Sequence, residues 1–235
     1  MQKNILITGA SRGLGNGLAV KYLEAGFRVF ACMRDINSTK LNELKKSYGD
    51  HLQVIEMDIS ETFSVEKAAV KIKAMTGSLD IIINNAGIHA EDSFNVLEEI
   101  NVDDCLEVYN VNTLGALRVA KAFLDLLDKG DGGILVNISS ESGSITNCFR
   151  EKEFDYCMSK AALNMQSVLL QNYLKSRNIK VLAIHPGWFR SDMGGPNAHL
   201  AVSEAAEGVV AIIEKTGNDL NAPIFIDHTG NTMSY

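Results

Sequence analysis

The fold is decided near the start of the chain by the stretch Ile5-Leu6-Ile7-Thr8-Gly9-Ala10-Ser11-Arg12-Gly13-Leu14-Gly15. Its apolar run predicts a buried strand, and after the glycines apolar residues recur at helical spacing, at Leu14, Leu18, Ala19, Tyr22 and Leu23. A glycine-rich turn between a strand and a helix directs free backbone N–H groups and the positive end of the helix dipole at one point. This stretch therefore predicts a site for a pyrophosphate.

The glycine spacing, Thr-Gly-x-x-x-Gly-x-Gly, differs from the general G-x-G-x-x-G fingerprint, so two alternatives stand beside it. One is a glycine-rich turn that binds nothing. The other is the nucleophile elbow of the α/β-hydrolases, because Gly9-Ala10-Ser11-Arg12-Gly13 matches G-x-S-x-G. That elbow needs an oxyanion loop from an earlier strand, and no strand precedes Ile5 in this sequence. We therefore expect the nucleotide site.

Composition narrows the function further. The chain has 235 residues, 46% of them hydrophobic, and a net charge of −7, with no run of Lys or Arg longer than two, which argues against nucleic acid. We expect no signal peptide and no membrane span, and a cytoplasmic location. The four cysteines form no Cys-x-x-Cys pair and the five histidines are scattered, so we expect reduced thiols and no metal.

Strands and helices alternate along the whole chain. We predict strands over 5–7, 28–33, 52–57, 79–83, 132–139, 179–185 and 224–227, and helices over 41–48, 62–75, 94–109, 111–127, 155–175 and 203–215, the last with Ser203 as N-cap. The continuous apolar strands are typical of parallel strands buried on both faces. We expect a single α/β domain over 1–235, a doubly wound parallel sheet of Rossmann type with about seven strands and helices on both faces.

A tyrosine and a lysine carry the candidate chemistry. Tyr156 and Lys160 are four residues apart on a predicted helix and share one face. A neighbouring ammonium favours the phenolate and lowers the pKa of the tyrosine, which can then act as general acid or base. An isolated pair of this kind is usually a solvated helix face. Here Ser140 ends a predicted strand, Asn112 precedes that strand, and Asn84-Asn85-Ala86-Gly87 ends another.

Together these motifs resemble the short-chain dehydrogenase/reductase family from Ile5 to the end of the chain. They follow the order of that family: Thr8-Gly9-x-x-x-Gly13-x-Gly15, Asn84-Asn85-Ala86-Gly87, Asn112, Ser140, Tyr156-x-x-x-Lys160 and Pro186-Gly187. The resemblance implies four catalytic residues. Tyr156 would transfer the proton, Lys160 would lower its pKa and hold the nicotinamide ribose, Ser140 would polarise the carbonyl, and Asn112 would keep a water on the proton path.

The resemblance also implies a set of cofactor-binding residues. They are Gly9, Ser11, Arg12, Gly13, Leu14, Gly15, Arg34, Asp58, Ile59, Asn85, Ala86, Gly87, Tyr156, Lys160, Pro186, Gly187, Phe189 and Ser191. Asp58 and Ile59 would flank the adenine, and Phe189 and Ser191 would lie against the nicotinamide amide. Of the two adjacent serines we choose Ser140, because the family pattern places a glycine three residues later, where Gly143 stands.

Charge at the end of the second strand indicates which dinucleotide binds. NAD-binding members carry an Asp there, which takes the ribose 2′-hydroxyl. This sequence has Met33 followed by Arg34, and Arg12 lies in the glycine turn. Two cations suit a 2′-phosphate, so we expect NADP(H). Asp35 keeps NAD(H) open as the alternative.

The regions around the substrate are less regular. The run Arg150-Glu151-Lys152-Glu153 predicts a solvated loop at the pocket rim, and 188–202 predicts a short substrate lid that resembles the sniffer and C-factor group of carbonyl reductases. Phe149, Trp188 and Met193 would line an open pocket for a ketone or aldehyde. The alternative is a dinucleotide-binding sensor or signalling protein with little turnover. We expect a homodimer or homotetramer paired through 94–127 and 155–175.

Overall fold

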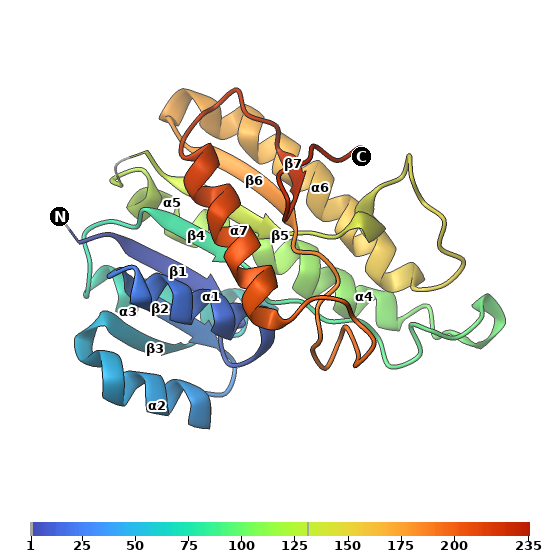
Figure 1. The fold of residues 1–235 in the computed structure, drawn as a ribbon, viewed down its shortest axis with the longest axis horizontal. Coiled ribbons are helices and arrows are strands. Elements are labelled where there is room, and N and C mark those ends of the chain that lie inside the picture. The colour runs from blue at the N-terminus through green and yellow to red at the C-terminus, as the bar shows by residue number, and fades with distance from the viewer. Residues whose placement is uncertain (1, 131) are drawn as a thin grey trace.

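The computed structural model describes residues 2–130 and 132–235. Seven parallel strands form one sheet: β1 (Asn4–Thr8), β2 (Arg28–Met33), β3 (Leu52–Glu56), β4 (Ile81–Asn84), β5 (Ile134–Ile138), β6 (Lys180–His185) and β7 (Phe225–Asp227). Their order is β3-β2-β1-β4-β5-β6-β7 (Figure 1). This is the predicted doubly wound α/β fold of Rossmann type, and the prediction of its class is confirmed.

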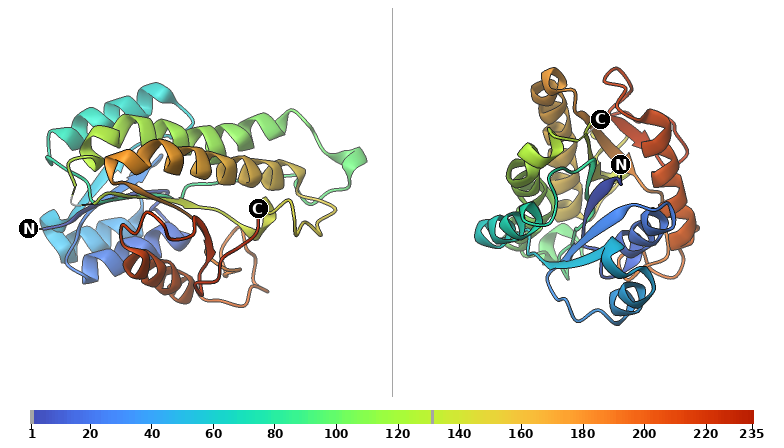
Figure 2. Two further views of the ribbon diagram at one scale, coloured as in Figure 1. Left: turned by 90° about the horizontal axis from the view of Figure 1, so that it is seen from above. Right: turned by 90° about the vertical axis from the view of Figure 1, so that its left-hand side faces the viewer.

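The helices divide between the two faces of the sheet. They are α1 (Gly13–Glu24), α2 (Thr39–Tyr48), α3 (Thr62–Lys73), α4 (Asp104–Tyr109), α5 (Ala116–Leu127), α6 (Phe154–Leu174) and α7 (Val202–Thr216). One core joins α1, α2 and α7 to one face, and a second core joins α3, α5 and α6 to the other (Figure 2). Because side chains alternate along a strand, Ile5 and Ile7 enter the first core and Leu6 enters the second.

The strand order reverses between β1 and β4. From β1 the chain continues to β2 and β3 on one side of β1. It then crosses to β4 on the other side of β1, and β5, β6 and β7 follow in that direction. In open α/β sheets a crevice forms outside the carboxyl ends of the strands at such a switch point, and ligands bind there. The glycine turn after β1 and the segment after β4 both lie at this edge, so the fold brings the sequence motifs together.

Two helix predictions were wrong. The segment predicted as helical over 94–103 is made of turns and a single 3₁₀ turn at Leu97–Glu99, and α4 begins only at Asp104. The Asp92 carboxylate accepts a hydrogen bond from the Asn101 amide at 2.5 Å, which closes the turn. The last long helix begins at Val202 rather than after a Ser203 cap, and Glu204 accepts from the Ala201 amide. The remaining elements differ from prediction mainly at their ends.

No helix in the two described ranges combines the length and apolar character that a membrane crossing requires.

Candidate active site

The glycine turn has the geometry of an anion cradle. Gly9 and Gly13 have positive φ values of 66° and 53°, a backbone conformation that residues with a Cβ rarely adopt. A Cβ on Gly15 would overlap the carbonyl oxygen of Gly9, and one on Gly9 would lie 2.9 Å from the Cα of Ala86. The Arg12 side chain makes no capping hydrogen bond at the start of α1, and the first turn of that helix holds no acidic residue. These features keep the helix N-terminus suited to a phosphate.

The segment after β4 is tied to the glycine turn by Thr8. The buried Thr8 hydroxyl accepts hydrogen bonds from the backbone amides of Asn85 and Ala86, each at 3.0 Å. In return the Asn85 side chain donates to the carbonyls of Thr8 and Gly9 at 2.9 and 3.3 Å. Thr8 therefore fixes both halves of the crevice relative to each other. Thr8 is a site residue that sequence reasoning missed, although it belongs to the glycine motif.

Asn112 lies in a π-helical segment, Asn110–Gly115, that joins α4 to α5 in one continuous helix. The amide of its side chain accepts from the Ile88 N–H at 2.8 Å, and donates to the Ile88 carbonyl at 2.8 Å and to the Ser159 hydroxyl at 3.0 Å. Single π turns are often found at functional sites, because they turn a side chain out of the regular helical order. Here the turn bridges the segment after β4 to α6.

Tyr156 and Lys160 lie on the first turns of α6, as predicted. Lys160 Nζ lies 5.4 Å from the centre of the Tyr156 ring and donates to the Ile138 carbonyl at 2.8 Å. A Cβ on Gly87 would lie 3.3 Å from Asn112 Oδ1 and 3.7 Å from Lys160 Nζ, so both groups border that glycine. Burial lowers the pKa of Lys160 to about 8.

The pKa of Tyr156 departs from our expectation. Burial and the charge of Glu141 raise it above the ordinary value for a phenol, and a hydrogen bond with Ser140 offsets only part of this rise. Lys160 was expected to lower the pKa of Tyr156, but in the chain by itself the net shift of that pKa is upward. Tyr156 is a protonated phenol at neutral pH in this arrangement.

The two adjacent serines have different partners. Ser139 donates to Asn164 Oδ1 at 2.6 Å and is buried, so its hydroxyl is committed to packing α6 against β5. Ser140 instead lies within hydrogen-bonding reach of the Tyr156 phenol. Its oxygen also accepts from the Ser142 amide at 3.1 Å, which caps the 3₁₀ turn Glu141–Gly143. This division supports the choice of Ser140.

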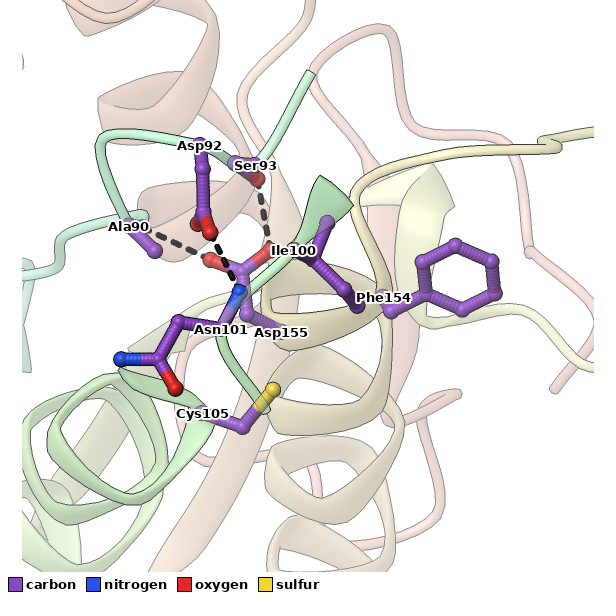
Figure 3. Close-up of a pocket in the computed structure, with 8 residues that line it drawn as sticks. All are labelled: Ala90, Asp92, Ser93, Ile100, Asn101, Cys105, Phe154 and Asp155. Atoms are coloured by element: carbon purple, nitrogen blue, oxygen red, sulfur yellow. Dashed lines mark hydrogen bonds between the residues drawn. The ribbon is translucent and has the colours of Figure 1, made fainter. Parts of the chain in front are cut away.

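Asp155 fixes the start of α6, and sequence reasoning missed it. This buried carboxylate accepts from the Ala90 amide at 2.7 Å and from the Ser93 hydroxyl at 2.6 Å (Figure 3). Figure 3 shows these contacts beside a small hollow that Cys105 and Phe154 also line. Asp155 immediately precedes Tyr156, so the loop after β4 and the phenol are held as one unit.

A chain of ion pairs was also missed. Arg150 pairs with both Glu141 and Glu153, and the Glu141 carboxylate accepts from the Ser140 hydroxyl at 2.5 Å. The prediction of a solvated rim is therefore right for the exposed Glu151 and Lys152 and wrong for Arg150 and Glu153, whose side chains are only 25% and 16% exposed. No sequence signal reveals this chain of ion pairs, because its members are irregularly spaced in the connection between β5 and α6.

The residues predicted to bind the adenosine half of the nucleotide differ in how far they are engaged by other side chains. Arg34 is exposed directly after β2, and the carboxylate of Asp35 accepts from the backbone amide and the side-chain amide of Asn37 at 2.9 and 2.8 Å. Arg12 pairs with Asp192 at 2.5 Å, and both side chains are largely exposed. The glycine turn is thereby joined to the segment after β6. Asp58 accepts from the amide and hydroxyl of Ser60, which shapes the turn after β3 and leads into the buried Ile59.

The segment after β6 folds on itself. Gly187 has a φ of 80° and packs against the His228 ring. Beyond it, Phe189 and Leu200 form an isolated bridge, Ser191 Oγ accepts from the Gly194 amide at 3.0 Å, and Trp188 Nε1 donates to the Gly194 carbonyl at 2.8 Å. Among the predicted pocket residues, Trp188 and Met193 lie in this segment, 49% and 40% exposed. Phe149 lies on the loop before α6 and is 77% exposed.

Comparison with known proteins agrees with this geometry. A sequence model of the short chain dehydrogenase family matches residues 3–199, and the chain belongs to that family. Three similar proteins illustrate the relationship. Estradiol 17-beta-dehydrogenase 2 of mouse is 34% identical over 197 residues, which are 83% of this chain and 50% of that protein, so the chain spans about half the length of this relative.

The two solved structures match over nearly their full length. The NADPH-bound carbonyl reductase from chicken fatty liver is 30% identical, with a TM-score of 0.87 over 100% of this chain and 99% of that one. The carbonyl reductase Sniffer of Drosophila melanogaster is 28% identical, with a TM-score of 0.90 over 100% of both chains. The predicted resemblance to the family and to its sniffer-like carbonyl reductases is thus confirmed.

Proposed function

We propose that this chain is an NADP(H)-dependent carbonyl reductase that acts on a ketone or aldehyde, with Tyr156 as general acid. The observation that carries the proposal is the convergence of Tyr156 with Ser140 and with Lys160, whose ammonium borders Gly87, at the carboxyl ends of β4 and β5. The likeness to two carbonyl reductases, one of them bound to NADPH, supports it. The reverse reaction would be oxidation of a secondary alcohol.

The residues present fit a dinucleotide. The cradle at Gly9, Gly13 and Gly15 is a space that a Cβ would fill, and the capping side-chain hydrogen bond at α1 is missing within the described ranges. Gly9 to Gly15 would hold the pyrophosphate, Arg34 the 2′-phosphate, Asp58 and Ile59 the adenine, Asn85 to Gly87 and Lys160 the riboses, and Pro186 to Ser191 the nicotinamide amide. When bound, a reduced nicotinamide supplies a hydride to the carbonyl carbon.

The protein's own residues would manage the proton. A carbonyl oxygen placed between Ser140 and Tyr156 would accept a hydrogen bond from the Ser140 hydroxyl, which would turn to it from Glu141, and then the phenolic proton. Because burial and Glu141 raise the pKa of Tyr156, the phenol carries its proton at neutral pH and can donate it to the carbonyl oxygen. Lys160 is a second proton carrier in the same pocket, and its lowered pKa of about 8 eases proton exchange with Tyr156. Asn112 would order a water that leads from Lys160 to solvent.

The test is turnover of a panel of aromatic and aliphatic ketones and aldehydes, with NADPH and with NADH in parallel. We expect oxidation of NADPH that depends on the carbonyl compound. Tight nucleotide binding with no turnover across the panel would instead favour the dinucleotide sensor. Ester hydrolysis that is lost in Ser11→Ala and unaffected by Tyr156→Phe would favour the hydrolase.

We also propose that the chain pairs through α4, α5 and α6. Exposed apolar side chains gather on these helices: Leu106, Tyr109, Leu117, Met158, Met165, Leu169 and Tyr173. On α6, Met158, Met165, Leu169 and Tyr173 recur every four or seven residues and so lie along one side of the helix. Contiguous apolar surface of this kind marks interaction sites, which supports a dimer or tetramer.

A further inference from the structure

A carboxylate is held directly against the serine of the proposed active site. Glu141 follows Ser140 at the end of β5, and its Oε2 atom accepts from the Ser140 hydroxyl at 2.5 Å and from the Ser142 amide at 2.9 Å. Arg150 holds the other carboxylate oxygen, Oε1. With both oxygens engaged, the carboxylate cannot swing away from Ser140. An oxygen atom bound by Ser140 would therefore lie a few ångströms from a fixed charge.

Glu141 is ionised throughout the useful pH range. Burial alone would raise the pKa of this carboxyl, but hydrogen bonds from Ser140 and Arg150 and the charge of Arg150 lower it to about 2. The side chain is 33% exposed, so its charge acts partly through protein rather than through water. The negative charge is a constant feature of the site.

The nearest cation does not neutralise this end of the site. Arg150 is shared between Glu141 and Glu153, so one positive charge faces two negative ones. His185 lies 3.9 Å from Glu141, but burial lowers the pKa of its ring, which leaves it neutral at pH 7. Lys160 lies beside Gly87 and donates to Ile138, on the proposed nucleotide side of the phenol. The substrate side therefore carries an excess of one negative charge.

This charge is partly open to solvent beside the proposed site, because the Glu141 side chain is partly exposed. Glu141 and Arg150 line a shallow recess together with Ser142, Asn147, Cys148 and Phe149. Phe149 is exposed at its rim, with the Arg150 guanidinium 5.7 Å from its ring centre. The recess is a shallow surface feature, so a substituent of a carbonyl compound bound at Ser140 would lie across it, with the Glu141 carboxylate beside Ser140 and the Phe149 ring farther out at the rim.

From this geometry we propose that Glu141 is a specificity-determining residue, which makes the site select uncharged or cationic carbonyl compounds and reject those that carry a carboxylate near the carbonyl. The inference rests on the proposed reductase function and narrows its substrate class. Two like charges about 6 Å apart at a partly buried site repel strongly enough to lower turnover by roughly tenfold or more, even when a shared arginine screens part of the effect.

The experiment uses three aryl methyl ketones of the same shape, which carry a carboxylate, a carboxamide or a trimethylammonium group on the ring. We expect the wild-type protein with NADPH to show a kcat/KM for the carboxylate at least about tenfold below that for the carboxamide, with the cation equal to or above the amide. In Glu141→Gln the ratio of carboxylate to carboxamide should rise toward one. Glu151→Gln, a charge change at an exposed site on the same loop, should leave the wild-type ratio in place.

Other results would overturn the inference in distinguishable ways. If the wild type uses the carboxylate and the carboxamide equally well, charge selection is ruled out and the reductase function stands. An unchanged ratio in an active Glu141→Gln variant would have the same meaning. Turnover of none of the three would overturn the reductase function and this inference with it. If Glu141→Gln does not fold, Glu153→Gln removes the second carboxylate and should also raise the ratio of carboxylate to carboxamide turnover. Added salt should raise the same ratio in the wild type.

Discussion

The Nζ atom of Lys160 lies 5.4 Å from the centre of the Tyr156 ring and donates a hydrogen bond to the backbone carbonyl of Ile138 at 2.8 Å. The lysine is thus anchored to the end of β5, and the phenol one helical turn earlier faces the same pocket. Burial of this ammonium lowers its pKa to about 8. A lysine that is charged below that pH and neutral above it makes both stability and chemistry depend on pH.

The first prediction concerns stability. The folded pKa of Lys160 lies below the value of 10.5 for an unperturbed lysine, so between about pH 8 and pH 10 the unfolded chain binds the proton more readily than the folded one. By linkage, the contribution of Lys160 to the free energy of unfolding increases as the pH rises through that window. The same contribution is lost as the pH falls to 8. The gain approaches about 3 kcal/mol at full extent.

The measurement is urea unfolding of the wild type and Lys160→Met at several pH values from 7 to 10. The difference between the two proteins removes the contributions of cysteines and tyrosines, whose raised pKa values act in the opposite direction. We expect the wild type to gain relative to Lys160→Met as pH increases. A difference that stays constant with pH would mean that Lys160 is not a buried titrating group.

The second prediction concerns Asp155. Its two carboxylate oxygens accept from Ala90 and Ser93, and an asparagine can replace only one of these acceptors. Asp155→Asn should therefore lower the free energy of unfolding by about 1–3 kcal/mol, because a buried donor loses its partner. Glu91→Gln, at an exposed position on the same loop, is the control and should be neutral. Equal stability of the wild type and Asp155→Asn would contradict this role.

Much of this arrangement was predictable from sequence, and the reasons are local. The carboxyl ends of parallel strands meet at one edge, so Gly9, Ser140 and Gly187 were expected near one another from their places after β1, β5 and β6. Spacing of four on a helix likewise joined Tyr156 to Lys160. These inferences need only the period of each element and the direction of the strands.

What sequence could not supply depends on how side chains in irregular segments contact one another. Glu141, Arg150 and Glu153 read as ordinary surface charges, and nothing in their spacing shows that Arg150 would turn inward between the other two. The first part of the helix predicted over 94–109 is not helical, because its apolar residues, such as Val96 and Leu97, are exposed in turns instead of forming a buried face. The raised pKa of Tyr156 follows first from burial of the phenol and then from the charge of Glu141, and both depend on how the segment between β5 and α6 packs.

The third prediction concerns the choice of dinucleotide. Arg34 is exposed after β2, and Asp35 is engaged by Asn37, which favours Arg34 as the group that meets the ribose substituent. Arg34→Ala should raise the KM for NADPH about ten- to a hundredfold, the worth of a charge-assisted hydrogen bond, and leave that for NADH nearly unchanged. Lys40→Ala, an exposed cation at the start of α2, is the control. Equal weakening of both nucleotides would assign the choice to Asp35.

The fourth prediction concerns assembly. Leu169 is 61% exposed on the outer side of α6, within the proposed pairing surface. Leu169→Glu would place a charge in a buried interface and should convert the wild-type dimer or tetramer to a monomer in light scattering at micromolar concentration. Val70→Glu is the matched control, since Val70 is 72% exposed on α3, away from this surface, and the variant should keep the wild-type mass. A monomeric wild type would rule out the pairing.

The central claim is that the Tyr156 hydroxyl delivers the proton, and Tyr156→Phe tests it most directly because only that oxygen is removed. The measurement is kcat/KM of wild type and variant for an uncharged aryl ketone with NADPH, together with the affinity of each protein for NADPH from nucleotide fluorescence. We predict a loss of about 10²- to 10⁴-fold in kcat/KM, the usual contribution of general acid catalysis, with the NADPH affinity within a few-fold of wild type. Turnover of Tyr156→Phe close to that of the wild type would contradict the account.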